Sequence, residues 1–168
     1  MVQFDLHASA LAIKEAGVLI RGASGSGKSR LALALITAAR ANGAFCRLIG
    51  DDRIKLENCS GRLIARGHSH ILGQIEQRGV GILQLPFLPA AVIRLVVDLA
   101  PADQAPRHPE ALGAGVTGND FLDWRCAEWD FRSLNSLELN GVRMPLLVLA
   151  ESAAASDLAL AVLQCFRF

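Results

Sequence analysis

Gly22-Ala23-Ser24-Gly25-Ser26-Gly27-Lys28-Ser29 is the stretch of this sequence that decides the fold. It fits the pattern G-x-x-x-x-G-K-[ST] at every fixed position, and average residue frequencies give a random match in such a chain on the order of once in a few hundred. The glycines let the backbone wrap closely around phosphates with its N–H groups pointing inward, and the helix that follows adds the positive end of its dipole. Lys28 then supplies a mobile charge for the β- and γ-phosphates, and Ser29 supplies a hydroxyl ligand for Mg²⁺. The stretch predicts a site for a purine nucleoside triphosphate, ATP, together with Mg²⁺.

The segments on either side of the loop support this interpretation. Val18-Leu19-Ile20 is a short continuous apolar run, which is typical of a strand buried on both faces. Residues 31–39 place leucines and an isoleucine among alanines, which are strong helix formers, and Asn42-Gly43 predicts the end of that helix. The order strand, loop, helix is the context that the pattern requires.

Most of the remaining chain predicts strands. The expected elements are strands at 4–13, with His7 inside it, 45–49, 82–85 and 91–99, hairpins around 58–61 and 140–141, and a terminal helix at 156–168. Residues 101–119 are rich in Pro, Gly and Ala and predict an irregular surface excursion. Because strands joined by short turns must be antiparallel, we expect one α/β domain over residues 1–168 with a mixed sheet.

Composition restricts the class of protein. The 168 residues make about one domain, and 52 % apolar with 20 % charged residues is a globular composition. A formal net charge of +1 lacks the basic excess of a nucleic-acid binder, and no apolar run reaches the length of a membrane span. The four cysteines are far apart in sequence and the N-terminus does not resemble a signal peptide, so we expect reduced thiols in a cytoplasmic protein.

Phosphoryl transfer also needs carboxylates, to hold Mg²⁺ and to accept a proton. Asp51 and Asp52 follow one predicted strand and Asp98 follows another, and the pattern favours the pair over Asp98. The alternative is that they only begin a turn, where Asp is common.

Two further groups have ordinary explanations on spacing alone. Glu76 and Arg78 are separated by one residue and share a side of an extended chain, as a surface ion pair would. A lone histidine in a strand, such as His7, is more often structural than catalytic.

In combination these elements resemble the catalytic domain of bacterial HPr kinase/phosphorylase. The resemblance rests on His7, the loop of residues 22–29, Gly50-Asp51-Asp52, and Ile75-Glu76-Gln77-Arg78-Gly79-Val80-Gly81-Ile82, which is similar to the family's E-x-R-G-x-G-I signature. It runs from about residue 6 to residue 99 and resumes weakly from about residue 137. It implies a P-loop domain of the HPr kinase/phosphoenolpyruvate carboxykinase type, in a short form without the family's N-terminal domain.

The resemblance implies an activity and a set of roles. The activity is transfer of the ATP γ-phosphate to a serine of HPr or an HPr-like carrier of the phosphotransferase system, by a homo-oligomer, a hexamer as in the family. Lys28 would hold phosphates, and Ser29 and Glu76 would bind Mg²⁺. Asp52 would be the general base with Asp51 beside it, and His7 would assist at the reacting phosphate. Arg107 is the best match to a family arginine, with Arg132 as an alternative.

Three departures from the family pattern stand out. The spacing from Ser29 to Asp52 is a few residues longer than usual, and residues 111–135 look like an insertion. The P-V-R-P-G-R element associated with dephosphorylation is reduced to Val142-Arg143-Met144-Pro145, so phosphorylase activity and the part of Arg143 in it stay open.

Two other functions remain as alternatives. A P-loop kinase of a small metabolite would carry a lid rich in arginines, whereas residues 111–135 offer only Arg125 and Arg132. A regulatory module that senses ATP would bind the nucleotide tightly and release no phosphorylated product.

Overall fold

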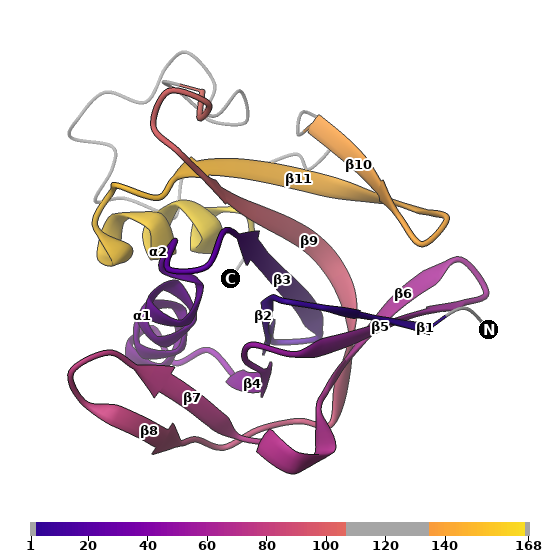
Figure 1. The fold of residues 1–168 in the computed structure, drawn as a ribbon, viewed down its shortest axis with the longest axis horizontal. Coiled ribbons are helices and arrows are strands. Elements are labelled where there is room, and N and C mark those ends of the chain that lie inside the picture. Colours follow the sequence, from indigo (N-terminus) through magenta and orange to yellow (C-terminus); the bar gives the residue numbers. More distant parts are fainter. Residues whose placement is uncertain (1–2, 107–134, 167–168) are drawn as a thin grey trace.

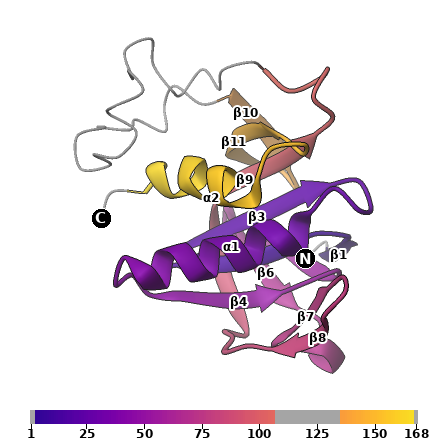
Figure 2. The same ribbon diagram turned by 90° about the vertical axis from the view of Figure 1, so that its left-hand side faces the viewer.

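The computed structural model describes residues 3–106 and 135–166, in which a curled sheet carries two helices on one face (Figures 1 and 2). Its elements are β1 (Gln3–Leu6), β2 (Ser9–Ile13), β3 (Ala16–Gly22), α1 (Lys28–Ala41), β4 (Cys46–Gly50), β5 (Ile54–Cys59), β6 (Arg62–Gly67), the 3-10 helix η1 (Ser69–Ile71), β7 (Gln74–Gln77), β8 (Gly81–Gln84), β9 (Ala90–Ala100), β10 (Asn135–Leu139), β11 (Val142–Ala150) and α2 (Ala155–Gln164). The expected α/β class, with its short-turn hairpins, is therefore confirmed.

The sheet is mixed, as predicted. Within the described ranges nine strands join it, in the order β1-β5-β6-β9-β3-β2-β4 with β11 and then β10 attached to β9, while β7 and β8 form a separate hairpin. β9 runs parallel to both β3 and β11, and the other pairs are antiparallel. The carboxyl ends of these three parallel strands meet at one edge of the sheet, which is where α/β proteins commonly bind ligands.

One predicted strand is wrong. Residues 4–13 form two strands, and His7 lies in a bend between them instead of inside a strand. β1 pairs with β5, whereas β2 pairs with β3 and β4. The strands with which the chain pairs change at His7. The alternation of apolar and polar residues gives no sign of this change.

The two helices lie side by side on the same face of the sheet (Figure 2). α1 begins at Lys28 directly after Gly27 and ends at Ala41, with Asn42 as the capping residue whose backbone N–H bonds back to the last turn, as predicted. Its buried side chains, which include Leu31 and Leu35, join those of α2 and the inner face of β3 in one apolar core. A second core lies on the other face of the sheet. The sheet is buried on both faces near β3, which explains the continuous apolar run there.

Two observations bear on the cysteines and on membranes. Cys46, Cys59 and Cys165 are free thiols, and burial raises the pKa of both Cys46 and Cys165 to about 12. Thiols with so high a pKa are unreactive near neutral pH. None of the described helices is long and apolar enough to cross a membrane.

We expect Gly67→Ala to destabilise the protein by about 1–3 kcal/mol or more, because β4 and β6 cross at this residue without room for a side chain. A Cβ on Gly67 would overlap the carbonyl oxygen of Ile49 and lie 2.8 Å from Leu72 Cδ2. The measurement is urea unfolding followed by circular dichroism. Gly43→Ala is the control, since its Cβ would meet open space and only its φ of 70° opposes the substitution. Equal losses in both variants would contradict the close crossing.

Candidate functional site

The glycine-rich loop, residues 22–29, connects the end of β3 to the start of α1. Gly25 and Gly27 have φ of 82° and 95°, a region that residues with a side chain rarely adopt. The side chain of Lys28 is folded into the loop, where Nζ donates to the carbonyl oxygens of Gly22 (3.1 Å) and Ala23 (2.9 Å). Burial lowers the pKa of Lys28, while the nearby Asp51 and Asp52 act in the opposite direction. Among the described residues the ammonium thus has only carbonyl partners, which a phosphate would replace with a stronger, charge-assisted contact.

The interior of this loop holds an unpartnered polar atom. Ser26 Oγ is buried and has no hydrogen-bond partner among the described residues. It lies so close to the neck of the loop that a Cβ on Gly22 would be 2.5 Å away. Buried hydroxyls usually find a partner. The closely wound backbone with this orphaned donor fits a loop that closes around a polyphosphate.

Asp51 is buried and accepts two hydroxyl hydrogen bonds. Ser29 Oγ, in the first turn of α1, donates to Oδ2 over 2.8 Å. Ser9 Oγ, in β2 between β3 and β4, donates to Oδ1. The carboxylate at the end of β4 is therefore held in one orientation next to the hydroxyl predicted to bind Mg²⁺. Ser9 was not predicted, because a serine in an apolar strand carries no sequence signal of a partner 42 residues away.

Asp52 is exposed and faces His7. His7 Nε2 lies 2.8 Å from Asp52 Oδ1, with side-chain exposures of 49 % and 68 %. Asp52 has a φ of 67°, which turns its side chain away from the buried position of Asp51. The two adjacent aspartates thus have different environments, one inside the protein and one at the surface of the site.

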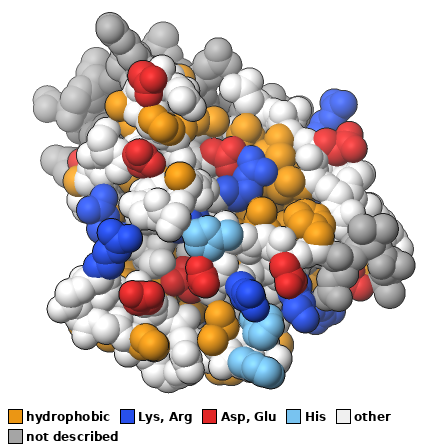
Figure 3. Space-filling model, viewed as in Figure 1, with side chains coloured by type: hydrophobic (Ala, Val, Ile, Leu, Met, Phe, Trp, Pro, Cys, Tyr) orange, Lys and Arg blue, Asp and Glu red, His pale blue; other side chains and the backbone are white. Residues whose placement is uncertain are grey.

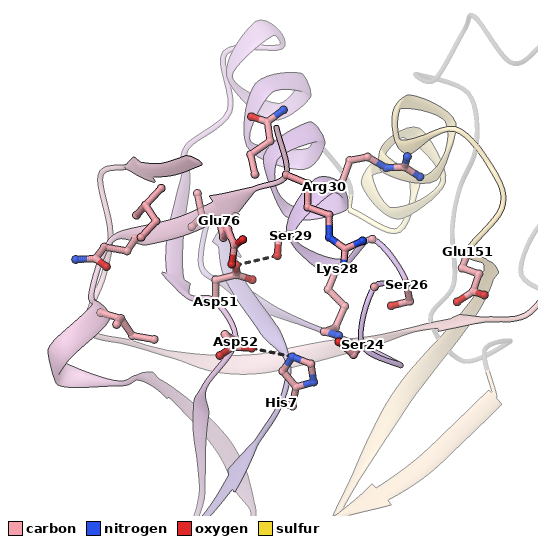
Figure 4. Close-up of a pocket in the computed structure, with 18 of the residues that line it drawn as sticks. His7, Ser24, Ser26, Lys28, Ser29, Arg30, Asp51, Asp52, Glu76 and Glu151 are labelled. Carbon is pink, nitrogen blue, oxygen red and sulfur yellow. Dashed lines mark hydrogen bonds and ion pairs between the residues drawn. The ribbon is translucent and has the colours of Figure 1, made fainter. Parts of the chain in front are cut away.

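A cavity of about 850 Å³ joins these groups (Figure 4). Of the predicted site residues, its lining includes His7, Ser24, Gly25, Ser26, Gly27, Lys28, Ser29, Asp51, Asp52 and Glu76. Gly22 and Ala23 contribute instead through the carbonyl groups that hold Lys28. Arg107 and its alternative Arg132 lie outside the described residues. Figure 3 shows acidic, basic and histidine side chains gathered on the face of the molecule seen in Figure 1.

Glu76 reaches the cavity from β7. Figure 4 shows its carboxylate pointing toward Asp51 and Ser29. Arg78, in the turn after β7, approaches the glycine-rich loop so closely that a Cβ on Gly25 would lie 3.6 Å from its Nη2. No ion pair joins Glu76 to Arg78 in the described part of the chain. Both side chains therefore face the cavity.

The third aspartate considered from the sequence lies elsewhere. Asp98 is the cross-strand neighbour of Arg21 and accepts from its Nε over 2.7 Å and its Nη2 over 2.5 Å. It does not line the cavity, and neither does Arg143. A carboxylate that already accepts a bidentate contact from a guanidinium has a structural role and is not available as a general base.

The oxygen donors at one end of the cavity suit Mg²⁺. Carboxylate and hydroxyl oxygens are its preferred protein ligands, and it usually takes one or two carboxylates with the rest from water and phosphate. Ser29, Asp51 and Glu76 supply such oxygens together. The lining residues that were not predicted include Arg30, Glu151 and Ser152. The last two follow β11, and only the parallel pairing of β11 with β9 brings them here.

We expect Ser9→Ala to destabilise the protein by about 1–3 kcal/mol, because Asp51 Oδ1 would be left buried without its donor. Ser9 is fully buried, so water does not reach the gap easily. Urea unfolding measures the loss, with the exposed Ser136→Ala on β10 as the control. A double-mutant cycle with Asp51→Ala isolates the pairwise term, because alanine removes the accepting oxygen. A cycle with no coupling would show that the bond contributes nothing.

Comparisons with known proteins agree on one family. The model for the "HPr Serine kinase C-terminal domain" matches residues 2–131. An HPr kinase/phosphorylase of Mycoplasma mycoides is 32 % identical over 155 residues, which cover 89 % of this chain and 46 % of that protein. One of Clostridium beijerinckii is 36 % identical over 83 residues, covering 49 % of this chain and 26 % of that protein. The chain therefore spans about half the length, or less, of these relatives.

A solved structure has the same fold. The "Hpr(Ser) kinase/phosphatase from Coxiella burnetii" superposes with a TM-score of 0.69 at 24 % identity, covering 96 % of this chain and 93 % of that one. At this identity the likeness establishes the fold.

Proposed function

Because this chain belongs to the family of HPr serine kinase C-terminal domains, we propose that it is a protein-serine kinase dependent on ATP and Mg²⁺. Its acceptor is a serine of HPr or of an HPr-like carrier of the phosphotransferase system. The observation that carries the proposal is the single cavity that holds both the glycine-rich loop and the exposed pair of Asp52 and His7. A kinase needs a phosphate site and a proton acceptor within reach of each other.

The reaction is an in-line displacement. The acceptor serine Oγ attacks the γ-phosphorus, the bond from that phosphorus to the β,γ-bridging oxygen breaks, and ADP leaves. Asp52 takes the serine proton, and His7 beside it assists at the reacting phosphate. Most of the rate comes from position and charge, since Lys28 and the loop amides hold the phosphates in place.

Ser29 and Glu76 are the residues we assign to Mg²⁺. Asp51 orients the Ser29 hydroxyl, because its Oδ2 accepts from Ser29 and its Oδ1 accepts from the buried Ser9. When bound, the ion neutralises charge that develops between the β- and γ-phosphates. The two aspartates therefore have different roles: the buried Asp51 lies beside the metal ligand Ser29, and the exposed Asp52 faces the acceptor serine.

Several wider properties belong to the same proposal. The protein acts in the cytoplasm, as a homo-oligomer, with residues 1–168 as one catalytic domain. Arg107, or in its place Arg132, completes the phosphate site. The exposed Arg143 lies outside the cavity lining, so residual phosphorylase activity would have to operate without its contact in this arrangement.

Incubation with ATP labelled on its γ-phosphate, Mg²⁺ and an HPr-like carrier tests the function. We expect label on one carrier serine, located by peptide mapping. Label on a carrier histidine would contradict the proposal. A phosphorylated small metabolite would favour the metabolite kinase, and tight ATP binding with no labelled product would favour the sensing module.

A further inference from the structure

Glu151 lies in the turn after β11, at the edge of the sheet where the glycine-rich loop begins. β11 is parallel to β9, and β9 is parallel to β3, which leads into the loop. The backbone N–H of Glu151 donates to Ala100 O over 2.9 Å, and the turn is closed by Ala153 N–H to Ala150 O over 3.1 Å. Its backbone is therefore fixed against the end of β9, and its side chain lines the cavity.

The carboxylate of Glu151 has no cation to neutralise it among the described residues. No described lysine, arginine or histidine forms an ion pair with it. It is partly buried, so water reaches only part of it. A partly desolvated acceptor in a cavity wall favours a ligand that donates hydrogen bonds.

Glu151 also stands apart from the groups assigned to the phosphates. Figure 4 shows it beyond Ser24 and Ser26, on the side of the loop away from Asp51 and Glu76. A negative side chain repels phosphate oxygens, so the terminal phosphates belong at the Lys28 and Ser29 end of the cavity. The uncharged part of a nucleotide must then extend toward the other end, where Glu151 is.

We propose that Glu151 binds the ribose of the nucleotide, by accepting hydrogen bonds from its 2′ and 3′ hydroxyl groups. A carboxylate has two oxygens that accept from two adjacent hydroxyls, and an acidic side chain commonly performs this task in other nucleotide-binding α/β proteins. The inference rests on the proposed function, since it requires a nucleoside triphosphate in the cavity. It makes Glu151 a specificity residue that distinguishes ATP from its deoxy forms and from inorganic polyphosphate.

Titration calorimetry in the presence of Mg²⁺ tests this with four ligands: ATP, 2′-deoxy-ATP, 3′-deoxy-ATP and inorganic tripolyphosphate. For Glu151→Ala we expect ATP to bind about 10- to 100-fold more weakly, the range for a lost hydrogen bond to a charged group. Tripolyphosphate should bind as well as before or slightly better, because a negative charge has been removed. The wild type should prefer ATP to each deoxy form, and the variant should bind all three alike.

Two further variants make the result interpretable. Glu151→Gln keeps one acceptor oxygen without the charge, and it should bind ATP with an intermediate affinity. Glu138→Ala removes an exposed glutamate on β10 that does not line the cavity, and it should change nothing. Unchanged melting temperatures of the ligand-free variants show that each is folded.

Several outcomes would overturn the inference. Wild-type affinity for ATP in Glu151→Ala excludes a contact, and equal losses for ATP and tripolyphosphate indicate a distorted loop. A Glu151→Ala variant that still prefers ATP to its deoxy forms excludes a contact with the ribose hydroxyls. If wild-type protein binds no ATP at all, the proposed function fails together with this inference. If the protein binds ATP but transfers no phosphate to a carrier, the proposed kinase activity fails while the inference about Glu151 stands.

Discussion

Asp52→Asn lowers the rate of serine phosphorylation by about 10²- to 10⁴-fold, the range that general-base catalysis contributes. Asparagine has nearly the same shape as aspartate and tolerates a positive φ, here 67°, so the local backbone is retained. What the substitution removes is the anionic oxygen that lies 2.8 Å from His7 Nε2 and that would accept the serine proton. Because Asp52 is exposed and does not bind the loop, ATP affinity should stay within about threefold of wild type, well below the 1.4 kcal/mol of a tenfold change.

The measurement is single-turnover transfer of labelled phosphate to an HPr-like carrier, with ATP affinity from calorimetry. Asp5→Asn, on the exposed side of β1 and outside the cavity lining, is the control for removal of one negative charge. Transfer at the normal rate in Asp52→Asn would exclude Asp52 as the base. A parallel loss of ATP affinity would instead assign it to nucleotide binding.

Lys28→Ala weakens ATP binding and abolishes transfer. The loss of a charged contact to the β- and γ-phosphates weakens ATP binding by about 1.5–3 kcal/mol, and loss of the same charge in the transition state lowers the rate by at least a further 10²- to 10³-fold. In the wild type, ATP at a hundred times its Kd stabilises the fold by about 2.7 kcal/mol. At the same ATP concentration the variant should show little of this stabilisation. Thermal unfolding with and without ATP measures the difference.

The same variant should remain folded without nucleotide. Lys28 is buried and its pKa is lowered from 10.5, which means that the folded chain disfavours its charged form. Between the lowered pKa and 10.5 the unfolded chain binds more protons than the folded one, so stability rises with pH in that window. Lys28→Ala should lack this rise, whereas Lys55→Ala on β5 should retain it. An unfolded Lys28→Ala protein would show that the lysine supports the empty loop itself.

The parts of the fold that could be predicted are those encoded within a few neighbouring residues. The pattern of Gly22 to Ser29 indicated strand, loop and helix, because glycine positions and helix periodicity act on the local backbone. Asn42-Gly43 predicted the end of α1, and the hairpins expected around 58–61 and 140–141 were found for the same reason, with the first turn limited to residues 60–61. The resemblance to the family was also carried by short motifs, and the family model confirms it.

The break at His7 was missed because pairing partners are not a local property. The alternation of apolar and polar residues continues across residues 6 to 9. At the same point the pairing partner of the chain changes from β5 to β3 and β4. The bend that results is what frees the His7 side chain to face Asp52. In a single continuous strand, the alternation of side chains between the two faces of the sheet would have fixed the direction of the His7 side chain.

The sequence by itself determined the phosphate loop, the helix behind it, the acidic end of β4 and the signature around Glu76. The tertiary structure alone decided which carboxylates share the cavity: Asp51 is bound by Ser9 from 42 residues away, and Asp98 is bound by Arg21 from 77 residues away. It also brought Glu151 to the loop through the parallel pairing of β11 with β9. The physical reason is that a turn or a helix depends on the dihedral angles of adjacent residues, whereas a side chain's partner across a sheet depends on strand order and register, which only the packed sheet defines.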